Sequence, residues 1–126
     1  MKKFIYALMA LSLAACTESL EDKAAREAKE YTEKYCPTPF INDSRTDSTS
    51  FDKKTKTYNY YVTLRGKADN ATVIAANKEK LHSIQQEALD NNPGLKSYKE
   101  AHFRFRFIYH SASQKGQVLL DDVFKY

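Results

Sequence analysis

The 126-residue sequence is poor in the residues from which compact catalytic motifs are built. Its three glycines leave little room for a Gly-rich loop that cradles phosphate, and its two cysteines form no paired-cysteine metal motif. It also lacks a His-Glu-x-x-His metal motif and a nucleophile elbow. We therefore expect no enzyme, no metal and no cofactor.

The few titratable residues that attract attention are poorly spaced for chemistry. His102 and His110 share one face of a predicted strand, but eight extended residues separate them by ~27 Å. That is too far for one metal, because zinc–nitrogen bonds are ~2 Å. Asp121 and Asp122 are adjacent, so on a regular strand their side chains diverge and cannot act as an acid/base pair. A hydrolase site assembled from scattered polar residues is the less favoured alternative.

Composition and charge favour one folded domain without a nucleic-acid partner. Hydrophobic residues make up 42% and charged residues 29% of the chain, which is enough to bury a core. The formal net charge is +4, and it falls to +2 if the segment with Lys2 and Lys3 is removed, since residues 1–15 contain no Asp or Glu. Such a mild positive charge does not indicate nucleic-acid binding.

The first sixteen residues form an export signal. Met1-Lys2-Lys3 is positively charged, and the apolar run from Phe4 to Leu13 is too short to span a membrane. Leu13-Ala14-Ala15-Cys16 resembles the lipobox of bacterial lipoproteins. The resemblance implies cleavage before Cys16, a diacylglycerol on its sulfur and an acyl chain such as palmitate on the new amino group. Two or three chains together give stable anchoring.

The predicted organisation is a signal peptide over residues 1–15, a lipidated tether over 16–19 and one domain over 20–126. Thr17 after the cysteine implies, by the same resemblance, transfer to the outer membrane. The acidic Glu18, Glu21 and Asp22 weakly favour the cell surface, so the periplasmic or surface side stays open. A soluble secreted protein in which Cys16 occurs by chance is the alternative.

Cys36 is the remaining thiol once Cys16 carries lipid, so it has no partner for an intramolecular disulfide. We favour a small buried residue at the end of a helix. An intermolecular disulfide in an oxidising compartment is the main alternative.

The residues 102–110 alternate strictly, which predicts a strand. Phe103, Phe105, Phe107 and Tyr109 share one side of it, and so large an aromatic surface must be covered. Helical spacing predicts covering helices over 20–35 and from Asp69 or Asn70 to about residue 91. Strand patterns predict a hairpin over 45–65 and a last strand over 118–126, with a bulge near Asp121-Asp122.

The resulting order is α-β-β-α-β-β. We predict an α+β fold with a four-stranded antiparallel sheet and both helices on one face. Two separately packed hairpins joined by the second helix are the alternative. This layout resembles that of small bacterial lipoproteins.

The opposite sheet face is the candidate binding surface, because basic and aromatic residues gather there. Such a face could bind an envelope protein with an acidic surface, an anionic glycan or lipid head groups. The simpler interpretation is a solvated face whose arginines pair with Asp121 or Asp122. The predicted face comprises Asn59, Tyr61, Arg65, His102, Arg104, Arg106 and His110.

We therefore expect a lipid-anchored protein of the bacterial cell envelope that acts as a non-enzymatic binding module. It would contact the membrane through the lipid on Cys16. An inhibitor or immunity-type protein, which blocks a toxin or hydrolase through an exposed face or strand edge, is the alternative.

Overall fold

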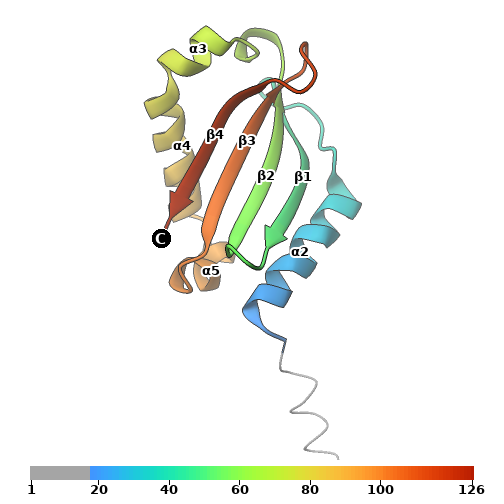
Figure 1. The fold of residues 1–126 in the computed structure, drawn as a ribbon, viewed down its shortest axis with the longest axis vertical. Coiled ribbons are helices and arrows are strands. Elements are labelled where there is room, and N and C mark those ends of the chain that lie inside the picture. The colour runs from blue at the N-terminus through green and yellow to red at the C-terminus, as the bar shows by residue number, and fades with distance from the viewer. Residues whose placement is uncertain (1–17) are drawn as a thin grey trace, which may run out of the picture.

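The computed structural model describes residues 18–126, so the predicted signal segment and Cys16 lie outside the described residues. The described chain forms one four-stranded sheet with helices along its two outer edges (Figure 1). The elements are α2 (Leu20–Tyr35), β1 (Ser44–Asp52), β2 (Thr57–Leu64), η1 (Gly66–Ala68), α3 (Ala71–Ala76), α4 (Lys78–Asp90), η2 (Pro93–Leu95), α5 (Lys96–Glu100), β3 (Arg104–Ser111) and β4 (Val118–Lys125).

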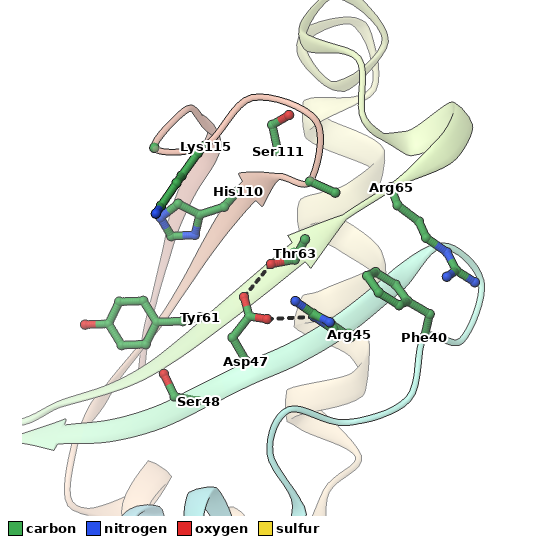
Figure 2. Close-up of a pocket in the computed structure, with 12 residues that line it drawn as sticks. Phe40, Arg45, Asp47, Ser48, Tyr61, Thr63, Arg65, His110, Ser111 and Lys115 are labelled. Carbon is green, nitrogen blue, oxygen red and sulfur yellow. Dashed lines mark hydrogen bonds and ion pairs between the residues drawn. The ribbon is translucent and has the colours of Figure 1, made fainter.

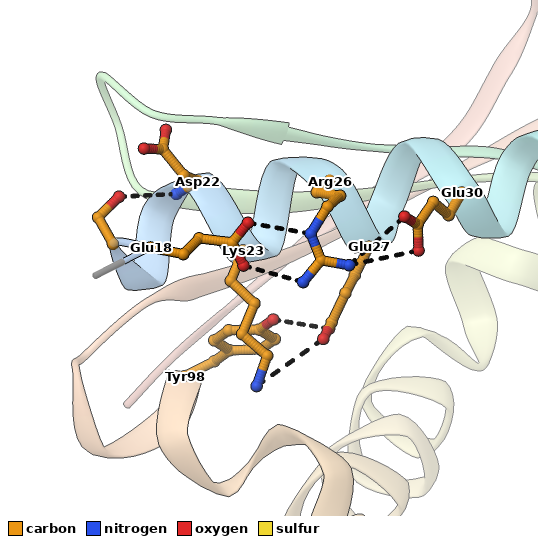
Figure 3. Close-up of polar contacts among 8 residues, drawn as sticks. Glu18, Asp22, Lys23, Arg26, Glu27, Glu30 and Tyr98 are labelled. Atoms are coloured by element: carbon orange, nitrogen blue, oxygen red, sulfur yellow. Dashed lines mark hydrogen bonds and ion pairs between the residues drawn. The ribbon is translucent and has the colours of Figure 1, made fainter. Parts of the chain in front are cut away.

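Helix α2 begins and ends where helical spacing predicts. The Ser19 side chain accepts a hydrogen bond from the Asp22 backbone N–H, which caps the first turn. Ala24 and Ala28 are fully buried, and their small size lets the helix backbone approach β1 closely. Arg26 lies on another side of the helix and donates hydrogen bonds to Glu18 and Glu30 (Figure 3).

The prediction of one continuous second helix, to about residue 91, is wrong because the helix is interrupted. Asn70 caps α3 by accepting hydrogen bonds from the backbone N–H groups of the first turn. The helix then breaks at Asn77, whose backbone leaves helical geometry at φ −110° and ψ 13° and whose side-chain amide donates to the Val73 carbonyl, 2.8 Å away. An asparagine that bonds to nearby backbone competes with helix continuation. The chain resumes as α4, turns through η2 and adds the short α5.

The sheet is mixed, so the predicted all-antiparallel pairing is wrong. The strand order is β1-β2-β3-β4, with antiparallel pairing within each hairpin and parallel pairing between β2 and β3. The segment from η1 to α5 carries the chain back to the end of the sheet where β2 began (Figure 1). β3 therefore starts beside Thr57 and must run in the direction of β2.

The larger of two hydrophobic clusters confirms that the helices share a face of the sheet, against the alternative of separate hairpins. It joins Ala24 and Ala28 of α2 to Leu89 of α4 and to aromatic rings of the strands. Phe103 and Phe105 are fully buried there, and Phe107 is 7% exposed. The Tyr60 and Phe107 rings stack across the central strands with centroids 4.4 Å apart.

The bulge predicted near Asp121-Asp122 lies elsewhere in β4, and β1 has a second bulge that was not predicted. In β4 the register shifts between the partners of Tyr109 and His110, so Leu119 is the extra residue, and not Asp121 or Asp122. Asp122 stays in regular pairing opposite Phe107 and points to the helix side, where His82 provides a partner. A second bulge places Asp47 of β1 outside the regular register.

Candidate functional site

The uncovered face of the sheet carries six of the seven residues predicted to form a binding surface. Asn59 and Tyr61 lie on β2, Arg65 directly follows it, and Arg104, Arg106 and His110 lie on β3. The prediction fails for His102. This residue lies in the turn before β3, with a left-handed backbone (φ 61°), and its Nδ1 is 2.9 Å from a backbone oxygen of Tyr126.

The half of this face near the start of β2 is a shallow polar hollow of about 510 Å³ between Asn59, Arg104, Arg106 and Asp121. Arg106 donates two hydrogen bonds to Asp121 across the strands, and these hold the pKa of Asp121 below its ordinary value. Asn59 is 7% exposed, and its Oδ1 has no hydrogen-bond partner among the described residues. In this half of the face, the pairing of an arginine with Asp121 is the one expected for an ordinary solvated face.

The half of this face near the end of β2 is a larger hollow of about 720 Å³, which we call the cationic hollow (Figure 2). Arg45, Thr63 and His110 form one row across three strands, since Thr63 pairs with both of the others. Arg65 lies at the end of β2, and Lys115 lies on the turn between β3 and β4. Tyr61, Arg65 and His110 of the predicted face thus line this hollow.

The bulge in β1 organises the floor of the cationic hollow. It turns Asp47 toward the uncovered face, where its carboxylate accepts hydrogen bonds from Thr63 and from Nε of Arg45 (Figure 2). Bulges commonly re-aim a side chain in this way. The Phe40 ring lies between two guanidinium groups, with the Cζ atoms of Arg45 and Arg65 at 4.8 and 4.0 Å from its centroid. Sequence reasoning missed Phe40, Arg45, Asp47 and Lys115, because the bulge in β1, the chain before β1 and the turn after β3 bring them to this face.

The helix side of the sheet has two further hollows, each of about 360 Å³, that the sequence did not predict. The α2 hollow lies between α2 and the hairpin and is lined by Tyr31, Thr46, Tyr58 and Tyr60. The α4 hollow lies over the other end of the sheet, and Leu64, Ile74, Leu81, Ile84, Tyr109 and Leu120 form its apolar lining. Both exist because α2 packs on β1 whereas α3 and α4 pack on β4, so the helices lie along opposite edges (Figure 1).

The rims of these hollows expose apolar side chains. Ile84 is 57% exposed beside the α4 hollow, and Tyr31 is 39% exposed beside the α2 hollow. Ile41, next to the lining residue Asn42, is 69% exposed. For Tyr31 and Ile84 the only sequence signal was the helical spacing of apolar residues, which predicted core packing and not a free surface. Burial raises the pKa of Tyr58 and Tyr109, which line the α2 and α4 hollows, to about 12.

His82 and Asp122 form a pair that sequence spacing could not reveal. Nδ1 of His82 lies 2.9 Å from each carboxylate oxygen of Asp122, and the imidazole stacks on Phe124 with centroids 4.3 Å apart. The Asp122 side chain is 12% exposed. The pair fastens α4 to β4 and so fixes one wall of the α4 hollow.

Cys36 ends α2 in a half-buried position, and burial raises the pKa of its thiol. Among residues 18–126, no three His, Cys, Asp or Glu side chains gather in a way that could hold a metal ion. None of the helices in the described part of the chain is long and apolar enough to cross a membrane.

Sequence comparison identifies the family. The family described as a domain of unknown function (DUF8479) matches residues 19–120. The chain belongs to this family. A comparison with curated proteins found no match.

Solved structures share the fold of this DUF8479 member. A protein of Pseudomonas aeruginosa described as secreted has a TM-score of 0.64 at 12% identity, covering 85% of this chain and 94% of its own. The pilotin of the Vibrio vulnificus type 2 secretion system has a TM-score of 0.61 at 14% identity, with 82% and 86% covered. The type II secretion system pilotin of Vibrio cholerae has a TM-score of 0.58 at 15% identity, with 83% and 87% covered. At such identities the likeness establishes the fold alone.

Proposed function

We propose that this chain is a lipid-anchored, non-enzymatic binding module of the bacterial cell envelope, whose α4 hollow receives an apolar segment of a partner protein. The observation that carries this proposal is the exposure of Ile84 at the rim of a hollow whose floor is apolar. Grooves of this kind take up the apolar face of a helix from a partner. The fold shared with two pilotins of type 2 secretion systems supports a partner that belongs to an envelope assembly.

The position of the α4 hollow suits an anchored protein. Helix α2 begins beside the β1–β2 turn, where Asp22 bonds to Lys53, and the α4 hollow lies toward the other end of the sheet, between Leu64 and Leu120. Lipid on Cys16 would therefore hold the membrane near the start of α2. The hollow would face away from the bilayer, toward proteins of the envelope.

Photo-crosslinking from a single position tests the partner. A photoreactive amino acid replaces Ile84 in the full chain in its native cell, and the matched control carries it at Lys29, whose side chain is 77% exposed on α2. We expect position 84 alone to yield an adduct with one envelope protein, mapped to an apolar segment. That segment, made as a peptide, should bind the purified protein and lose affinity for Ile84→Asp. Equal adducts from both positions would contradict the proposal.

The lipid anchor is tested separately by metabolic labelling with an alkyne fatty acid. The natural chain and Cys36→Ser should incorporate the label and sediment with membranes. Cys16→Ser should do neither, since it lacks the sulfur that carries the diacylglycerol. Label retained in Cys16→Ser would exclude lipidation at this residue without touching the proposed role of the α4 hollow.

A further inference from the structure

The cationic hollow on the uncovered face is a second site, independent of the α4 hollow on the helix side. Four basic side chains line it, and they come from four separate segments: Arg45 from β1, Arg65 from the end of β2, His110 from β3 and Lys115 from the following turn. Asp47 is the one carboxylate in the lining, and Thr63 and Arg45 already bond to it. Positive charge in this hollow therefore exceeds negative charge.

The basic groups keep free hydrogen-bond donors. Arg45 uses its Nε for Asp47, and Arg65 approaches Asp43 through its Nε at 3.6 Å, so the terminal N–H groups of both guanidiniums have no described polar partner. Stacking on Phe40 holds these two guanidiniums in place. Lys115 forms no ion pair among the described residues. Preorganised guanidinium forks with free donors are suited to carboxylates.

The positive charge is divided between two sides of the hollow. Arg45 and His110 lie in one row with Thr63 between them, so two strand spacings, or ~10 Å, separate their backbones. A ligand that carries two separated carboxylates matches this row better than a single small anion does. Acidic residues two or three positions apart in an extended peptide are separated by ~7–10 Å, which matches this spacing.

Most of the free donors in the lining are cationic. Thr63 donates to Asp47, and Ser111 bonds to Ser113 and accepts from the Gln114 backbone N–H, which leaves Ser48 and Tyr61 as the lining hydroxyls without a described partner. The two guanidiniums and the Lys115 ammonium together carry more free N–H donors than these two hydroxyls, which favours carboxylates over the neutral hydroxyls of a glycan. We infer that the cationic hollow binds an acidic, extended segment of a protein, with carboxylates on both sides of Thr63.

The test uses calorimetry on the full chain in detergent, with a synthetic peptide in which glutamate alternates with serine. Glutamine replaces glutamate in the control peptide. Arg65→Glu/Lys115→Glu should weaken binding of the glutamate peptide by more than about tenfold. Lys29→Glu/Lys96→Glu makes the same change in net charge on exposed lysines outside the hollow and should leave the affinity within about twofold. Lys115→Gln, a turn substitution that leaves the sheet intact, should give an intermediate loss.

Three outcomes would overturn the inference. One is no binding of the glutamate peptide to the natural chain. Another is an equal loss of affinity in both double variants, because the effect would then come from the net charge of the protein and not from the hollow. The third concerns an oligogalacturonate with as many carboxylates as the glutamate peptide. If it bound at least as tightly as the peptide and lost affinity in the same variants, the hollow would be assigned to a glycan. Ile84→Asp should not change the affinity for the glutamate peptide, so this result is separable from the proposed function.

Discussion

Thr32 provides a sharp test of how α2 is held on the edge strand β1. Its hydroxyl accepts a hydrogen bond from the Thr49 backbone N–H at 2.8 Å and lies 3.0 Å from the Thr49 carbonyl oxygen. The hydroxyl of Thr49 in turn donates to the Ala28 carbonyl at 2.7 Å. A side chain of α2 thus supplies the partners that an edge strand would otherwise lack.

Thr32→Val removes this hydroxyl and changes little else. Valine has nearly the same shape and a similar helix propensity, so the remaining effect is the loss of partners for the Thr49 backbone. Leaving such groups unpaired costs about 1–3 kcal/mol. Because Thr32 is half-buried and water reaches part of the site, we expect a loss of about 2 kcal/mol and a fall in Tm of roughly 8–10 °C.

Urea unfolding followed by far-ultraviolet circular dichroism measures the loss. The midpoint should fall while the denaturant slope stays unchanged, because the surface exposed on unfolding is the same. Thr72→Val is the matched control, since Thr72 is exposed and its hydroxyl makes no hydrogen bond among the described residues. If Thr32→Val lowered stability no more than Thr72→Val does, the reasoning about α2 and β1 would be refuted.

Three further predictions concern the two sheet faces. Burial raises the pKa of Tyr58 and Tyr109 from 10.0 to about 12, so their stabilising contribution is complete below pH 10 and is lost as pH rises toward 12. The absorbance of tyrosinate should therefore rise together with unfolding in an alkaline titration. Titration of every tyrosine before unfolding begins would contradict this. His82→Ala leaves the mostly buried Asp122 without its partner and should cost about 1–3 kcal/mol in urea unfolding. Asp121→Asn breaks a solvent-exposed ion pair and should cost under about 1 kcal/mol, with a smaller effect at high salt.

The candidate site could be predicted only in part. The alternation of β2 and β3 placed Tyr61, Arg104 and Arg106 on the uncovered face, because side-chain direction follows directly from a period of two. The sequence offered Asp121 or Asp122 as the partner of an arginine, and the register of β4 decided that Asp121 pairs with Arg106. It could not place Asp47, which reaches the uncovered face through a bulge.

The sequence by itself determined most of the segments that become helices and strands and the burial of Phe103, Phe105 and Phe107. Local periodicity carries that information, and α2, the two hairpins and the ring-lined core follow from it. The tertiary structure decided the parallel pairing of β2 with β3, the pairing of His82 with Asp122 and both hollows on the helix side. Each of these depends on where the crossover returns the chain and how far apart the helices lie. Contacts between residues 40 or more positions apart set the parallel pairing and the pair of His82 with Asp122, and local periodicity does not encode them.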